Sequence, residues 1–279
     1  MKLGNLASRV AVAVIAVPIL LFIIYQHRPE PVWVTVFVAA IIAMSEFFAM
    51  TLESRADRVA GTVTGAVAIA VLYWLPVAFP EADGVFLLLA MFCAVAPIFL
   101  YYLFRLGDME TSATRMAMTV TGIFYGGFLF TFLAFIKRDF GPMGGHFVVL
   151  VLVVAWMADT GAYTFGRLWG NRKLYPAVSP KKTRAGALGG VVGSVIGASV
   201  VRVLFLDHMG WADILVIAAV GSVLGQLGDL AESLIKRSRG VKDSGTILGG
   251  HGGILDRCDA VLFIAPFVYL YLQIRLLTM

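Results

Sequence analysis

The sequence is poor in charged residues. Only 14% of its 279 residues are Asp, Glu, Lys or Arg, whereas a soluble domain carries about 25%. Hydrophobic residues make up 60% of the chain. This combination excludes an ordinary soluble domain and indicates an integral membrane protein. The net charge of +5 predicts no nucleic-acid partner, because Lys and Arg in a membrane protein mainly mark its cytoplasmic face.

Cysteine is scarce as well. Cys93 and Cys258 are the only two, and both lie in or at the edge of apolar segments. Their position excludes a disulfide framework and a thiolate metal site. At the N-terminus, Lys2 and Arg9 precede an apolar run over about 10–25, as in a signal peptide. The run is long for such a peptide and has no clear cleavage site, so we expect a signal anchor.

What the chain has in abundance is long apolar runs, which predict an all-α, polytopic membrane protein. A spanning helix needs about 20 mostly apolar residues. Nine segments meet this requirement: roughly 10–26, 32–51, 59–79, 84–104, 116–136, 146–165, 185–205, 211–232 and 258–276. We assign residues 1–145 to an N-terminal transmembrane scaffold of about five helices and residues 146–279 to a C-terminal catalytic region of about four helices.

The basic residues predict an orientation in the membrane. With nine spans, 17 of the 22 Lys and Arg residues fall on one side. The five on the other side are Arg28, Lys137, Arg138, Arg202 and Arg275. The bias predicts a cytoplasmic N-terminus and an outside C-terminus. We expect the protein in the plasma membrane. The longest and most basic inside loops, about 166–184 and 233–257, both belong to the C-terminal half. We therefore expect the active site at the cytoplasmic side of that half.

The stretch 226–259 is dense in charge and glycine although it lies between two apolar segments. If its first part is helical, four polar residues share one face. They are Asp229, Glu232, Ser233 and Lys236. Carboxylates on this helix, opposite those that follow the glycine-rich loop, suit a hard cation. Because Lys, Arg and exposed glycine backbone lie beside them, the stretch predicts a site for a metal-bound polyphosphate.

A second basic segment, SPKKT over Ser179 to Thr183, precedes the seventh predicted span. Thr183 is placed to cap that helix. A helix N-terminus preceded by Lys181 and Lys182 is suited to binding phosphate. Alternatively, the two lysines only contribute to the positive charge of the inside loops. The span that follows carries Gly186, Gly190, Ser194 and Ala198 at steps of four, and this spacing predicts close packing against a neighbouring helix.

Two further acidic residues lie in or near predicted spans. Glu46 is inside the second span, where a carboxylate is costly and usually faces the protein interior. It either belongs to the site or makes a structural hydrogen bond. Asp159, near the cytoplasmic end of the sixth span, either reaches an interfacial cation or supports helix packing. The sequence leaves both questions open.

The motifs of the C-terminal half together resemble the signature of the phosphatidate cytidylyltransferases, also called CDP-diacylglycerol synthases. They are SxxKR at Ser233, KD at Lys242 and GHGGxxDRxD from Gly250, which span 233–259. The SPKKT segment, Asp229 and the DTxAY stretch from Asp159 extend the resemblance to roughly 155–260, and the first half resembles the family only in hydropathy. Two departures are Gly249, where the family usually has Pro, and Arg184-Ala185, where it commonly has Trp-Glu.

The resemblance implies an enzyme that converts CTP and phosphatidic acid into CDP-diacylglycerol and pyrophosphate with Mg²⁺. It implies metal binding by Asp229, Asp256 and Asp259. It implies catalytic roles for Lys236, Arg237, His251 and Arg257. It implies phosphate binding by Ser179, Lys181, Lys182, Thr183, Ser233, Lys242, Gly250, Gly252 and Gly253. For His251 we expect orientation of phosphate rather than proton abstraction. We expect membrane lipids to surround the protein. The sequence leaves four questions open: a second cation, a homodimer, the acyl-chain preference and the lipid entry route.

Three rival functions remain. A transporter would use Glu46, Asp159 and Asp229 as an ion path, but the charges cluster at one edge and the halves show no evident inverted repeat. A CTP-dependent polyprenol kinase or a synthase acting on ether-linked lipid would share much of the predicted site. We favour the glycerophospholipid because the full signature is present. The motif of CDP-alcohol phosphotransferases is absent.

Overall fold

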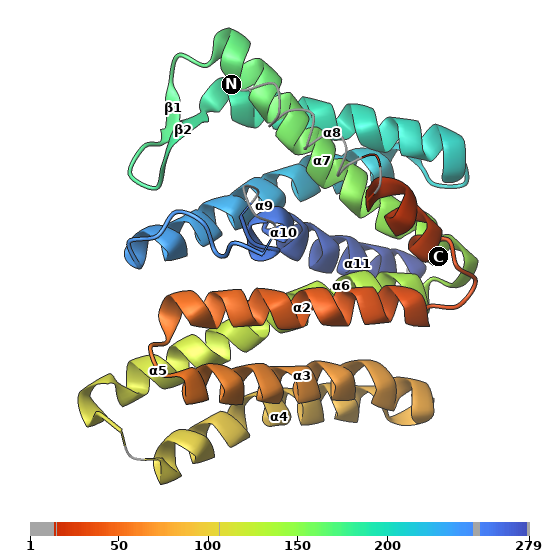
Figure 1. Cartoon of the computed structure of the whole chain (residues 1–279). Coiled ribbons are helices and arrows are strands. Elements are labelled where there is room, and N and C mark those ends of the chain that lie inside the picture. Colours follow the sequence, from red (N-terminus) through yellow and green to blue (C-terminus); the bar gives the residue numbers. More distant parts are fainter. Residues whose placement is uncertain (1–13, 15, 106, 248–251, 278–279) are drawn as a thin grey trace.

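A computed structural model describes residues 14, 16–105, 107–247 and 252–277 of the chain. This part is built mainly of helices, as predicted (Figure 1). The helices of the N-terminal half are α2 (Glu30–Thr51), α3 (Arg55–Ala78), η1 (Pro80–Ala82), α4 (Asp83–Phe104), α5 (Met109–Gly122), the π-helix η2 (Ile123–Phe128) and α6 (Leu129–Asp139). The C-terminal half contains η3 (Gly141–Met143), α7 (Gly144–Trp169), β1 (Lys173–Tyr175), β2 (Ser179–Thr183), α8 (Arg184–Phe205), α9 (Trp211–Ser238), α10 (Leu255–Cys258) and α11 (Val261–Leu277).

Seven helical segments of the described residues are long and apolar enough to cross a membrane. They correspond to the second through eighth predicted spans, and α5, η2 and α6 form one of them. The ninth predicted span corresponds to α11, whose 17 residues rise roughly 26 Å at 1.5 Å each. That falls short of the roughly 30 Å hydrocarbon core of a bilayer. The first predicted span lies partly outside the described residues, so the count of nine stays a prediction.

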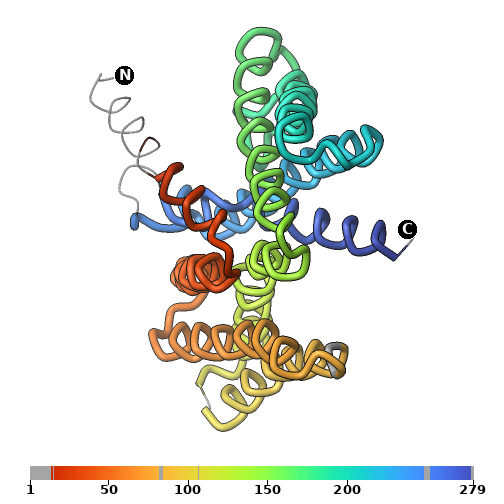
Figure 2. The backbone as a smooth tube through the Cα atoms, turned by 90° about the vertical axis from the view of Figure 1, so that its right-hand side faces the viewer, coloured from red at the N-terminus to blue at the C-terminus, as the bar shows by residue number. Residues whose placement is uncertain are grey.

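The helices are stacked in layers whose order differs from their order in the chain (Figures 1 and 2). From one end of the stack to the other come α3 with α4 and α5, then α2 with α6, then α9 with α10 and α11, and finally α7 with α8. The hairpin β1–β2, the C-terminal end of α9 and the α2–α3 and α4–α5 connections all lie on the left in Figure 1. These are the loops that the charge bias assigns to the cytoplasm, so the stacking brings the predicted inside loops to one end of the bundle.

Small residues set the closest approaches between helices. A Cβ added at Gly161 of α7 would collide with the carbonyl oxygen of Gly189 on α8. The buried Ser194 hydroxyl donates to the carbonyl of Val154 at 2.8 Å, which ties the same two helices together. The small residues at steps of four in α8 therefore pack against α7, as predicted. In the N-terminal half, Gly61 likewise makes room for a large side chain, the ring of Phe48.

The hairpin β1–β2 is a feature that the sequence patterns did not predict. Its strands pair antiparallel, with Lys173 opposite Thr183 and Tyr175 opposite Ser179. The segment SPKKT is strand β2, and α8 begins directly after it. Thr183 caps α8 as predicted, because its hydroxyl accepts a hydrogen bond from the Gly186 N–H at 3.1 Å. The hairpin therefore holds both lysines of SPKKT next to the N-terminus of a membrane helix.

Candidate functional site

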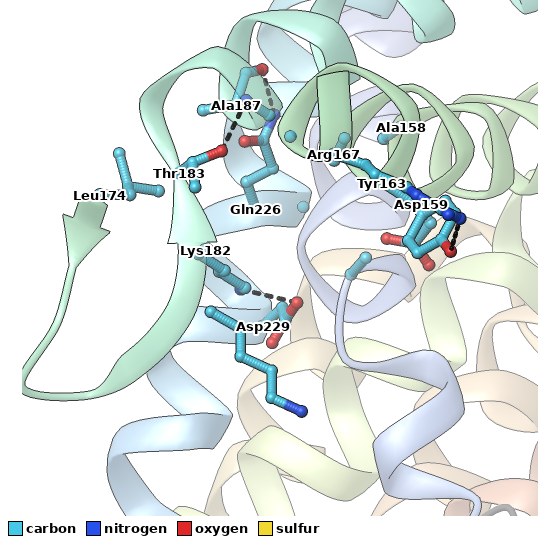
Figure 3. A pocket seen from close by; sticks show the side chains of 16 residues that line it. Ala158, Asp159, Tyr163, Arg167, Leu174, Lys182, Thr183, Ala187, Gln226 and Asp229 are labelled. Carbon is cyan, nitrogen blue, oxygen red and sulfur yellow. Dashed lines mark hydrogen bonds and ion pairs between the residues drawn. The ribbon is translucent and has the colours of Figure 1, made fainter. Parts of the chain in front are cut away.

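A pocket of about 420 Å³ opens between α7, α8, α9 and the hairpin (Figure 3). Four predicted site residues line it, namely Lys181, Lys182, Thr183 and Asp229. Strand β2 contributes the first three, and α9 contributes the aspartate. The pocket lining includes small residues, among them Gly186 and Gly225, where the backbone is within reach of a bound molecule.

Lys182 and Asp229 form an ion pair across this pocket. The Lys182 Nζ lies 2.6 Å from the Asp229 Oδ2, and Figure 3 shows the two side chains pointing toward each other. The side chains keep 25% and 33% of their surface exposed. Both side chains therefore line the pocket, while the Lys182 Nζ itself is buried against Asp229. A lysine held by a partly exposed carboxylate is well placed to exchange that partner for a phosphate oxygen.

The predicted polar face of α9 is present. The segment is helical to Ser238, and the Ser233 hydroxyl lies 3.4 Å from Asp229 Oδ1, one turn away. One turn further, the Lys236 Nζ lies 3.1 Å from Glu232 Oε1. The Glu232 and Lys236 side chains are only 1% and 9% exposed. The polar face therefore passes from an open end at Asp229 to a closed end at Lys236.

Asp256 belongs to the closed end. Its Oδ1 accepts from the Lys236 Nζ at 2.6 Å. Its Oδ2 accepts from the N–H groups of Ser244 and Gly253, each at 2.8 Å, and from the Ser244 hydroxyl at 2.9 Å. Burial alone would raise the pKa of Asp256, but the hydrogen bonds from Lys236, Gly253 and Ser244 outweigh burial and lower the pKa to about 2. Asp256 is thus an ionised carboxylate held by protein donors.

Glu46 of α2 also reaches this closed cluster. Its carboxylate accepts from the N–H groups of Ile254 at 3.1 Å and Leu255 at 2.9 Å, and from the Ser244 hydroxyl at 3.2 Å. Of the two roles that the sequence left open for Glu46, the structural hydrogen bond is therefore present. It joins the N-terminal half to the charged segment of the C-terminal half.

The carboxylates predicted to bind metal do not form one group. The Gly228 backbone approaches the carbonyl of Asp259 so closely that a Cβ at Gly228 would lie 2.7 Å from it, which brings Asp229 and Asp259 near each other. Asp259 lies shortly before α11, and the charges of Asp229 and Glu232 are close enough to act on it. Such crowded oxygen donors suit a divalent cation.

Asp256 does not join this crowded pair. Its carboxylate is turned toward Lys236 and Ser244 instead. Within the described ranges, no three His, Cys, Asp or Glu side chains are arranged to hold a metal ion. The donor chemistry of Asp229 and Asp259 thus fits Mg²⁺, whereas the donors already bound to Asp256 do not favour a metal there.

The other predicted residues are distributed around these two centres. Arg237 donates to the carbonyl of Val241 at 2.9 Å and lies on the surface. Lys242 and Arg257 are exposed, and Ser179 begins β2 outside the pocket lining. Gly252 has a φ of 77°, which favours glycine. The predicted residues Gly250 and His251 lie outside the described residues.

The pocket contains polar residues that the sequence patterns did not assign to the site. Asp159, Tyr163 and Arg167 follow one another at steps of four on α7 and all line it (Figure 3). Arg167 Nη1 donates to the Tyr163 hydroxyl at 3.2 Å. Gln226 of α9 donates to the Ala187 carbonyl of α8 at 3.2 Å. The four-residue spacing on α7 is the signal that marks this face. Asp159, left open before, is therefore a pocket residue.

Comparison with known proteins yields consistent matches. A family profile described as "Cytidylyltransferase family" matches residues 7–275. The match thus extends beyond the 155–260 that the motifs suggested. The chain is 32% identical to a phosphatidate cytidylyltransferase of Bacillus subtilis over 275 residues, which cover 97% of this chain and 98% of the relative.

Other relatives match over a shorter length. Phosphatidate cytidylyltransferases of Staphylococcus saprophyticus and Brucella suis are 41% and 43% identical to this chain. The matches cover 60% and 54% of this chain, and 61% and 55% of the two relatives. The higher identity over the shorter length indicates that part of the chain is more similar to these relatives than the whole chain is to the Bacillus subtilis protein.

Proposed function

This chain belongs to the cytidylyltransferase family, and we propose on that basis that it transfers CMP from CTP to phosphatidic acid, giving CDP-diacylglycerol and pyrophosphate. The observation that carries the proposal is the open pocket in which Lys181, Lys182 and Asp229 meet. Its lysines suit the phosphates of a nucleotide or lipid, and its carboxylate suits their metal.

The reaction joins two anions, so the site must offset their charge and align them. An oxygen of the lipid phosphate attacks the α-phosphorus of CTP, and the bond from that phosphorus to the bridging oxygen breaks as pyrophosphate leaves. Lys182 and Lys181 stabilise phosphate oxygens, and the Lys182 ammonium exchanges the Asp229 carboxylate for one of them. The small residues of the pocket lining leave room to hold the two reactants next to the lysines.

Asp229 and Asp259 are the residues that would hold Mg²⁺. When bound, the cation would neutralise negative charge on the phosphates. Lys236 and Asp256 are bound to each other and are closed off from the solvent, so in this proposal they support the shape of the site and leave the binding of phosphate to Lys181 and Lys182. Arg167 and Tyr163 lie across the pocket from the hairpin and complete its polar lining.

The test is to incubate the purified protein with phosphatidic acid, Mg²⁺ and each nucleoside triphosphate in turn, and to measure pyrophosphate and CDP-lipid. Of the nucleoside triphosphates, we expect only CTP to support turnover. Pyrophosphate-free phosphorylation of a lipid alcohol would instead favour a polyprenol kinase. Accumulation of a radiolabelled solute in proteoliposomes without CTP turnover would favour a transporter.

We also propose that the pocket faces the cytoplasm of the plasma membrane, because 17 of 22 basic residues fall on that side under the nine-span topology. Lys173→Cys in the hairpin and Arg239→Cys after α9 place a thiol on exposed positions of this end. In a background lacking Cys93 and Cys258, both should react with a membrane-impermeant maleimide only after the cytoplasmic side is opened. Labelling of intact cells would reverse the orientation.

A further inference from the structure

The carboxylate of Glu46 joins the N-terminal half to the charged segment that contains Asp256. Glu46 lies on α2 and is 8% exposed. Its three donors, Ser244, Ile254 and Leu255, are about two hundred positions away in the sequence, the last of them 209 residues from Glu46. A carboxylate inside a membrane helix is costly unless it is paired or hydrogen-bonded. Here each of its oxygens accepts hydrogen bonds from the backbone that leads into α10.

Glycines give this carboxylate the room that it needs. A Cβ added at Gly245 would lie 2.6 Å from Glu46 Oε1, and one added at Gly253 would collide with Oε2 and with the Ser244 hydroxyl. Both glycines therefore let the loop pack directly onto Glu46. In the GHGG motif, Gly253 is therefore required to be small because the Glu46 carboxylate of α2 packs against it.

Ser244 connects Glu46 to Asp256. Its hydroxyl lies 3.2 Å from Glu46 Oε2 and 2.9 Å from Asp256 Oδ2, and its N–H donates to Asp256 at 2.8 Å. The single hydroxyl hydrogen serves one carboxylate at a time. A continuous set of contacts therefore runs from Glu46 through Ser244 and Asp256 to Lys236 on α9. Moving Glu46 would shift the loop on which Asp256 depends.

We propose that Glu46 is a positioning residue for the reaction, acting through Ser244 and the loop backbone on Asp256. The proposal rests on the proposed function, since positioning has a meaning only if the neighbouring pocket is catalytic. It assigns to the N-terminal half a part in the chemistry beyond that of a membrane scaffold. Ser244 is assigned the same role, as the bridge between the two carboxylates.

The test compares Glu46→Gln with the matched control Glu53→Gln, whose side chain is exposed at the same end of the bundle. Glutamine keeps the shape of Glu46 but places an amide donor against a backbone N–H donor. We expect kcat to fall roughly ten- to hundredfold while KM for CTP and for the lipid changes less than about threefold, because hydrogen bonds to a charged group are worth about 1.5–3 kcal/mol. Glu46→Asp should retain more activity than Glu46→Gln, and the control should behave as wild type.

A second measurement reports on the loop itself. Ile247→Cys, an exposed position between Ser244 and Gly253, is labelled with a maleimide in a background lacking Cys93 and Cys258. Labelling should be faster in the Glu46→Gln variant than in the Glu53→Gln control.

Two results would overturn the proposal. They are an unchanged kcat in Glu46→Gln, whether or not its melting temperature falls, and equal labelling of residue 247 in the two variants. If the wild-type protein makes no CDP-lipid, the proposed function fails by itself. The labelling comparison still decides whether Glu46 holds the loop.

Discussion

Two lysine–aspartate pairs in this protein have the same N–O separation, 2.6 Å, but lie in different surroundings. The Lys182–Asp229 pair lines an open pocket, with side chains 25% and 33% exposed. The Lys236–Asp256 pair is closed, with both side chains 9% exposed. An exposed pair contributes little to stability and can exchange partners, whereas breaking a buried pair leaves an uncompensated charge. Surroundings rather than separation therefore suggest that the first pair binds substrate and the second holds structure.

The sharpest test of the open pair is Asp229→Asn. We expect CDP-lipid formation to fall about a thousandfold, because a metal-stabilised transition state loses several kcal/mol when a carboxylate ligand becomes an amide. The melting temperature in detergent should stay close to that of wild type, since the aspartate is a third exposed. Asp207→Asn, at an exposed position, is the control. Near-normal turnover with an unchanged Mg²⁺ optimum would place the metal site elsewhere.

Asp256→Asn tests the closed pair, and here stability should change as well as activity. The amide brings a donor toward Lys236, Ser244 and Gly253, all of which donate to the carboxylate now. We expect a loss of about 3 kcal/mol, at the low end of the range for a broken buried pair, because Glu232 still neutralises Lys236. Denaturant unfolding beside the Asp229→Asn variant measures it. Equal stability of the two variants would remove the distinction between the pairs.

Lys182→Ala and Lys181→Ala sharpen the comparison within the pocket. A charge-assisted hydrogen bond is worth about 1.5–3 kcal/mol, so kcat/KM should fall roughly ten- to hundredfold when the paired Lys182 is removed. Lys181 is more exposed and has no ion pair with Asp229, so its loss should cost less. Steady-state kinetics with CTP and lipid varied separately distinguish the two. Wild-type kinetics in both variants would indicate that the two lysines only contribute to the charge bias that orients the protein in the membrane.

The smallest expected effect concerns the helix pair that carries one wall of the pocket. Gly161→Ala places a methyl group against the Gly189 carbonyl of α8. Overpacking of this kind costs about 1–3 kcal/mol, and it should lower the melting temperature with a smaller effect on kcat. Gly84→Ala, where an added Cβ meets nothing within 4 Å, is the control. An unaltered melting temperature would show that α7 and α8 tolerate a wider separation.

Features that depend on neighbouring residues could be predicted from the amino-acid sequence. The apolar runs predicted seven of the helices that the structure describes, because a membrane requires about 20 apolar residues in one segment. The polar face of α9, the Thr183 cap and the small-residue packing of α8 also follow from a period of 3.6 residues or from contacts within one turn.

Which charges meet was settled by the packing of the helices. Three features depend on how helices distant in sequence pack together. They are the pairing of Lys182 with Asp229, the binding of Asp256 by Lys236 and Ser244, and the hydrogen bonds of Glu46 to a loop about two hundred residues away. Strand β2, which contains Lys181 and Lys182, likewise pairs with β1, and the short sequence of β2 does not predict this pairing. A local pattern places a residue on a face, but the neighbouring helix determines what that face touches, because side-chain contacts across a bundle are set by the packing of whole helices.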